Sequence, residues 1–189
     1  MSAPPTASQT VGPYFSCGLA TDLVAADLVA ADAPRAIRVE GTVLDGAGEP
    51  VPDALVEIWQ ADEPGRYAAE VDVAAGGGRV EGRFSGFARC ATDPEGHFHF
   101  LTVKPAGVAH PSGGLQAPHI AVAVFARGLL KHLVTRLYFP DETVSNAADP
   151  VLAAVPESRR PTLIAQQGSG ALVFDIRLQG PGETVFFAL

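Results

Sequence analysis

The chain has 189 residues and a mass of 19.6 kDa, which predicts a single domain (residues 1–189) whose core needs neither disulfides nor metal. Its formal net charge of −8 and pI of about 5.0 disfavour a nucleic-acid-binding protein, because such proteins are normally basic. Only 18% of the residues are charged and 47% are hydrophobic, so we expect partners to cover part of the surface.

Residues 1–19 are rich in Pro, Ser, Thr and Gly, a composition that predicts an extended arm rather than a helix. The arm carries the adjacent aromatic residues Tyr14 and Phe15, which we expect to dock either onto the chain's own core or onto a partner. The start of the chain has neither the basic residues nor the apolar stretch of a signal peptide, so we expect a cytoplasmic protein. Cys17 and Cys90 are therefore expected to be reduced, buried thiols.

After the arm, a tandem LVAAD repeat in residues 20–33 predicts a short helix or a loop, and a pattern of strands then begins. β-prone residues between turn signals such as Asp45-Gly46 and 93–96 predict strands at 37–44, 54–60, 97–103, 118–125, 134–139, 172–178 and 184–187. One helix is predicted at 156–165, in an insertion. The expected fold is all-β: a β-sandwich core of mostly antiparallel strands with one or two short helices in insertions.

The histidines do not form an obvious metal site. His97 and His99 would point the same way from one strand, as a ligand pair does, but Phe98 and Phe100 alternate with them. That alternation favours the solvent face of an amphipathic strand over two metal ligands. His119 stands alone within PHIA, where a hydrogen-bonded structural histidine is the commoner case.

Arg127 follows IAVAVFA, the most apolar segment of the chain, and precedes Gly128. A guanidinium at the mouth of an apolar element is suited to bidentate capture of a carboxylate. The alternative is a surface ion pair with Asp or Glu. Nucleophilic hydrolysis has no support, since no Gly-x-Ser-x-Gly motif occurs in the sequence.

Six segments, which run nearly from end to end in order, resemble the intradiol ring-cleavage dioxygenases. They are SQTVGPYF (8–15), GTVLDGAGEPVPDALVEIWQADEPGRY (41–67), FARCATDPEGHFHFLTVKP (87–105), APHIAVAVFARG (117–128), HLVTRLYFPDE (132–142) and FDIRLQGPGETVFF (174–187). Within the family, the chain is most similar to the alpha subunit of a heteromeric member.

The resemblance implies a β-sandwich with a mononuclear, non-haem Fe(III) held by two tyrosines and two histidines, because phenolates are hard donors that suit ferric iron. His119 matches the first histidine, but Ala121 occupies the second position and a tyrosine position falls near Val108. No tyrosine lies between Tyr67 and Phe100 for the other phenolate. We therefore expect this chain to hold no metal and to carry no catalytic residue of its own.

The resemblance also implies a homologous beta subunit that holds the Fe(III), in a higher-order alpha-beta oligomer. The substrate would be 3,4-dihydroxybenzoate, which reacts with O₂ at a shared site. By motif match, Gly12, Pro13 and Tyr14 of the arm and Arg127 would line that site and bind the substrate. The arm would dock either in cis or on the partner.

Two alternatives come from other classes. GTVLDGAGEPVPDALVEI by itself also resembles transthyretin-like accessory domains, which would make the chain a non-enzymatic β-sandwich interaction module. A metalloenzyme with a rearranged site would use His97, His99 and His119.

Overall fold

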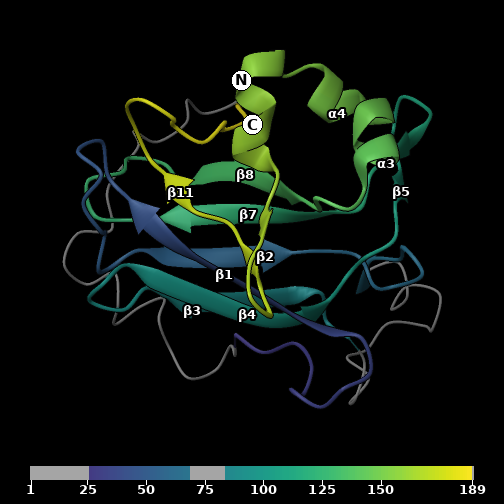
Figure 1. Ribbon diagram of the computed structural model, residues 1–189, viewed down its shortest axis with the longest axis horizontal. Coiled ribbons are helices and arrows are strands. Elements are labelled where there is room, and N and C mark those ends of the chain that lie inside the picture. Colours follow the sequence, from purple (N-terminus) through teal and green to yellow (C-terminus); the bar gives the residue numbers. More distant parts are fainter. Residues whose placement is uncertain (1–25, 69–83, 189) are drawn as a thin grey trace, which may run out of the picture.

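The computed structural model describes residues 26–68 and 84–188, and most of its strands form two sheets that face each other across a hydrophobic core (Figure 1). The expected β-sandwich is therefore confirmed. Gly12, Pro13, Tyr14 and Cys17 lie outside the described residues. In the described part of residues 20–33 there is no helix: Asp27 bridges to Leu101, and a turn follows.

The first sheet is built around β1 (Ala36–Leu44). On one side β1 pairs antiparallel with β4 (His97–Val103), and on the other it pairs parallel with β10 (Leu172–Val173) and β11 (Ile176–Arg177). The two-residue strand β9 (Gln166–Gln167) pairs antiparallel with β10.

The predicted strand at 172–178 is divided into β10 and β11, because the segment between them contacts β1 closely. Between them, the Phe174 amide donates to the Glu40 carbonyl at 2.8 Å, and the Thr42 amide donates to the Asp175 carboxylate at 2.9 Å. A Cβ at Gly41 would collide with the carbonyl oxygen of Phe174, so this position requires glycine. A carboxylate thus replaces a backbone acceptor here and interrupts the regular ladder.

The second sheet consists of four antiparallel strands in the order β3-β2-β7-β8. Their bounds are β3 (Phe87–Ala91), β2 (Leu55–Trp59), β7 (His119–Phe125) and β8 (Leu133–Tyr138). A small hairpin of β5 (Val108–Ala109) and β6 (Leu115–Gln116) precedes β7. The pattern-based reasoning missed β3, β5, β6 and β9, of which only β3 is longer than two residues.

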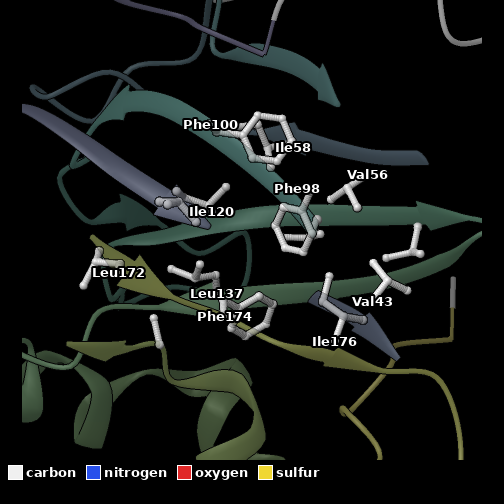
Figure 2. Close-up of a cluster of buried hydrophobic side chains, with 14 of the residues drawn as sticks. Val43, Val56, Ile58, Phe98, Phe100, Ile120, Leu137, Leu172, Phe174 and Ile176 are labelled. Atoms are coloured by element: carbon white, nitrogen blue, oxygen red, sulfur yellow. The ribbon is translucent and has the colours of Figure 1, made fainter. Parts of the chain in front are cut away.

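Alternate residues of both sheets fill the core (Figure 2). On β4, Phe98 and Phe100 are buried while His97 is exposed and His99 is half-buried, which confirms the solvent face predicted for the two histidines. A second apolar cluster (Ala117, Tyr138, Leu152, Val155, Leu163) lies between the end of β8 and the helices.

The helical prediction was partly wrong. Two short α-helices, α3 (Thr143–Ala148) and α4 (Pro150–Ala153), were not predicted, and the helix expected at 156–165 is the 3-10 helix η2 (Glu157–Leu163). Pro161 inside η2 has no amide hydrogen for an α-helical bond, which favours a short helix of another type. These helices lie beside β8 (Figure 1). No helix in the described part of the chain is long and apolar enough to cross a membrane.

The last predicted strand, at 184–187, forms no ladder. Phe187 makes only an isolated bridge to Val134, with an amide-to-carbonyl hydrogen bond of 2.8 Å.

Candidate functional site

The two histidine-matching positions, His119 and Ala121, lie two residues apart on β7 and therefore on one face of the second sheet. This face is turned away from the main core, which takes Ile120 from the same strand. Strand β8 places Tyr138 opposite His119 and Arg136 opposite Ala121. We call the set His119, Ala121, Arg136 and Tyr138 the ligand face, because it comprises the two histidine-matching positions and their cross-strand neighbours on β8.

His119 is held as a neutral structural group. Its side chain is buried, and its Nδ1 lies 2.8 Å from the Ala117 carbonyl oxygen. Because a carbonyl only accepts, Nδ1 carries the hydrogen and Nε2 is the unprotonated nitrogen. Burial, and then the guanidinium of Arg136, lower the pKa of His119 below its ordinary value of 6.5. The structure thus confirms the expected hydrogen-bonded histidine.

A fully buried carboxylate, Asp149, holds the ligand face and the start of α4 together through hydrogen bonds. It accepts hydrogen bonds from the Tyr138 hydroxyl at 3.1 Å, the Ala117 amide at 2.8 Å and the Leu152 amide at 2.7 Å. The last of these caps the N-terminus of α4. Burial raises the pKa of Tyr138 to about 12, so its side chain is a neutral phenol that donates to Asp149.

Arg136 brings a positive charge to the same face. Its Nη1 donates to the Gln116 side-chain oxygen at 2.8 Å and lies 3.5 Å from the Tyr138 hydroxyl oxygen. Gln116 in turn donates to the Ala109 carbonyl at 3.1 Å, which ties the network to the β5–β6 hairpin. Sequence reasoning missed Arg136, Gln116 and Asp149. The available signal was an arginine within the otherwise apolar LVTRLYF.

Val108, where a tyrosine position falls, is a buried residue of β5 that pairs with Gln116. The matching positions therefore present one imidazole, the methyl group of Ala121 and the isopropyl group of Val108, next to the guanidinium of Arg136. This donor set does not fit a ferric ion, which needs several anionic or imidazole ligands. In residues 26–68 and 84–188, no group of three or more His, Cys, Asp and Glu could hold a metal.

The rearranged metal site proposed from the histidines is not formed. His97 and His99 lie on β4 of the first sheet, on the side opposite the buried Phe98. His119 lies on the outer face of the second sheet. The three imidazoles therefore do not converge on one ion.

Arg127 lies in the turn that follows β7, where the Leu129 amide donates to the Ala126 carbonyl at 3.2 Å. Gly128 supplies the positive φ, +84°, that this turn requires. The guanidinium of Arg127 pairs with Asp53, and the arginine side chain remains 61% exposed. The surface ion pair weighed from the sequence is therefore present in the chain.

The structure does not bring Arg127 together with the ligand face. His119 begins β7 and Arg127 follows its other end, so about 20 Å of extended strand lies between them. Arg127 therefore does not contribute to the ligand face of its own chain.

Cys90, on the edge strand β3, is a free thiol that is half-buried. Cys90 is thus less buried than the sequence predicted, but burial still raises its pKa, which favours the protonated thiol near neutral pH.

Known proteins resemble the chain over nearly its whole length. A family model described as Dioxygenase (Dioxygenase_C) matches residues 10–180. The protocatechuate 3,4-dioxygenase alpha chain of Burkholderia cepacia is 44% identical, over 96% of this chain and 96% of that protein. The protocatechuate 3,4-dioxygenase beta chain of the same organism is 39% identical over 78% of this chain and 66% of that one.

A solved structure supports the fold. The intradiol ring-cleavage dioxygenase from Tetranychus urticae superposes with a TM-score of 0.61, covering 97% of this chain and 98% of that one, at 20% identity.

Proposed function

This chain belongs to the intradiol ring-cleavage dioxygenase family, and we propose that it is the iron-free alpha subunit of a protocatechuate 3,4-dioxygenase. With an iron-bearing beta subunit, it would form the complex that cleaves 3,4-dihydroxybenzoate between its hydroxyl-bearing carbons. Both atoms of O₂ enter the product, 3-carboxy-cis,cis-muconate. The step belongs to aromatic catabolism, in the β-ketoadipate pathway.

The observation that carries the proposal is that the ligand face lacks metal donors in a chain so similar to an alpha chain. The likeness covers 96% of both proteins, yet the methyl group of Ala121 stands at a matching ligand position and the guanidinium of Arg136 comes from the residue directly opposite it. A chain of this kind needs a partner to hold the Fe(III). The similarity to a beta chain as well supports a partner with the same fold.

We assign this chain a part in shaping the shared site. Arg127 stands on an exposed turn about 20 Å from its own ligand face, which suits a side chain that reaches into a neighbouring subunit. Its partner Asp53 is a carboxylate, so the substrate carboxylate could replace or join that contact without changing its chemistry. Gly12, Pro13 and Tyr14 are proposed to line the same pocket from the arm.

Three further features belong to the proposal. Residues 1–189 form one dioxygenase-like domain, as the family match over residues 10–180 supports. The alpha-beta pairs assemble into a higher-order oligomer, and the complex works in the cytoplasm.

Co-expression tests the proposal. The chain would be purified alone and together with the candidate beta subunit, and each sample assayed for iron content and for O₂ uptake with protocatechuate. We expect iron and activity only in the complex. Stoichiometric iron and ring cleavage in the chain alone would mean that the ligand positions have been misassigned.

The alternative of a non-enzymatic interaction module explains less of the chain. A transthyretin-like module would account for residues 41–58 alone, whereas the family match continues to residue 180. If the chain neither binds the beta subunit nor supports its activity, the interaction-module alternative would be favoured.

A further inference from the structure

The ligand face carries a positive charge beside the two positions that match histidine ligands. Arg136 is the direct cross-strand neighbour of Ala121, and both side chains leave the same face of the sheet. Such neighbours have Cβ atoms about 5 Å apart. An ion bound between His119 and a ligand at position 121 would therefore lie within reach of the Arg136 guanidinium.

His119 by itself has kept the arrangement of a metal ligand. Its Nδ1–H is engaged with the Ala117 carbonyl, as the second nitrogen of a ligating histidine usually is. This contact leaves Nε2 unprotonated, with its lone pair available. The loss of metal binding at this face is thus not explained by His119.

We propose that Arg136 excludes metal ions from the ligand face, and that restoring a ligand at Ala121 without neutralising Arg136 does not restore metal binding. The guanidinium supplies the positive charge that a bound ion would supply. It is held in place by Gln116 and linked to the buried Asp149 carboxylate through the Tyr138 hydroxyl. The face is therefore a completed hydrogen-bonded unit whose charge is balanced without a metal.

This inference concerns the chain's own residues and does not depend on a beta subunit. Its test uses the isolated chain and no enzyme activity, so its failure would leave the proposed function untouched.

The experiment is a Cu²⁺ titration, because Cu²⁺ binds imidazole most tightly among the divalent first-row metals. Trp59 is the only tryptophan, and its β2 position lies directly opposite Ala121, so quenching of its fluorescence reports binding at this face. The variants are A121H, A121H/R136Q and A121H/R136K. H119A/A121H/R136Q serves as the control for copper bound elsewhere.

We expect A121H/R136Q to bind Cu²⁺ at least about tenfold more tightly than A121H, a change of the size that residues around a metal site usually cause. A121H/R136K keeps the charge and should stay as weak as A121H, which separates repulsion from a loss of packing. The H119A control should lose the tight site. Equal affinity of A121H and A121H/R136Q, or tight binding by A121H/R136K, would overturn the proposal.

Circular dichroism would confirm that each variant folds. If R136Q does not fold, A121H/R136L removes the same charge and offers no metal ligand. The same tenfold criterion then applies to it.

Discussion

At the scale of single residues, Arg127 is the side chain that we propose to contact the substrate carboxylate. Its ion pair with Asp53 is exposed, and exposed pairs contribute at most about 1 kcal/mol to stability. In the alpha-beta complex, Arg127→Ala should therefore fold normally but raise the KM for protocatechuate by about 10- to 100-fold, the equivalent of one charged hydrogen bond. Steady-state O₂ uptake measures this change.

Catechol provides the control for Arg127, since it lacks the carboxylate. Its KM should be the same in the wild-type and Arg127→Ala complexes. Asp53→Ala removes the intrachain partner of Arg127 but keeps the guanidinium, so it should not raise the KM for protocatechuate. An unchanged KM for protocatechuate in Arg127→Ala would remove this residue from the site.

His119 predicts a pH dependence of stability. Its pKa in the folded chain lies below the ordinary 6.5 because of burial and the neighbouring Arg136. The unfolded chain therefore takes up a proton more readily, and acid favours unfolding. The contribution of His119 is complete above pH 6.5 and is lost as the pH falls from there toward the folded-state pKa.

Urea unfolding in steps from about pH 7.5 to 5.5 measures the slope that His119 predicts. Glutamine at position 119 does not titrate in this range, so His119→Gln should show a shallower fall in the free energy of unfolding than the wild type. Equal slopes in the two proteins would assign the pH dependence to other groups.

At the scale of elements, a glycine in β1 allows β10 and β11 to pair with that strand in the first sheet. Gly41 allows the segment between β10 and β11 to approach β1, and a Cβ there would collide with the Phe174 carbonyl and crowd the Phe98 ring. Gly41→Ala should therefore lower the free energy of unfolding by about 1–3 kcal/mol, as overpacking does. Urea denaturation measures this loss.

Gly46→Ala is the matched control for Gly41. A Cβ at Gly46 would lie 3.4 Å from the side chain of Gln179, which is ordinary contact with a movable group. Its effect should stay within about 0.5 kcal/mol. A loss in Gly41→Ala no larger than in Gly46→Ala would mean that the backbone yields easily at this crossing.

At the scale of the whole molecule, the surface is consistent with a subunit. Trp59 is 40% exposed, and Leu115, Leu130 and Val144 are exposed by more than half of their surface. Single exposed apolar residues are ordinary, so they do not define an interface. The low proportion of charged residues predicts a partly covered surface, which the proposed alpha-beta assembly would provide.

A folded partner should stabilise this chain by mass action. With free beta subunit at about 100 times its Kd, the stabilisation is about 2.7 kcal/mol, which corresponds to a Tm higher by roughly 5–10 °C for a chain of this size. Thermal scans at increasing beta concentration measure it, with the same concentrations of serum albumin as the control. A Tm independent of the beta concentration would argue against a stable alpha-beta pair.

Much of the fold was predictable because its signals are local. Alternation of apolar and polar residues located β1, β2, β4, β7 and β8, since side chains of a strand alternate between the core and the outer face. The helical insertion was placed only approximately, because short helices depend on packing more than on propensity. The break between β10 and β11 depends on Gly41, more than 130 residues earlier in the chain, and no local pattern contains it.

The sequence by itself determined the family and the missing ligands, because both are statements about which residues stand at which positions. The methyl side chain of Ala121 cannot bind a metal in any conformation. Only the tertiary structure decided what surrounds the vacated ligand positions and how far Arg127 lies from them. Strand pairing puts Arg136 opposite Ala121 and Tyr138 over Asp149, and the length of β7 separates Arg127 from that face. These are consequences of register and distance, which appear only when strands remote in sequence become neighbours.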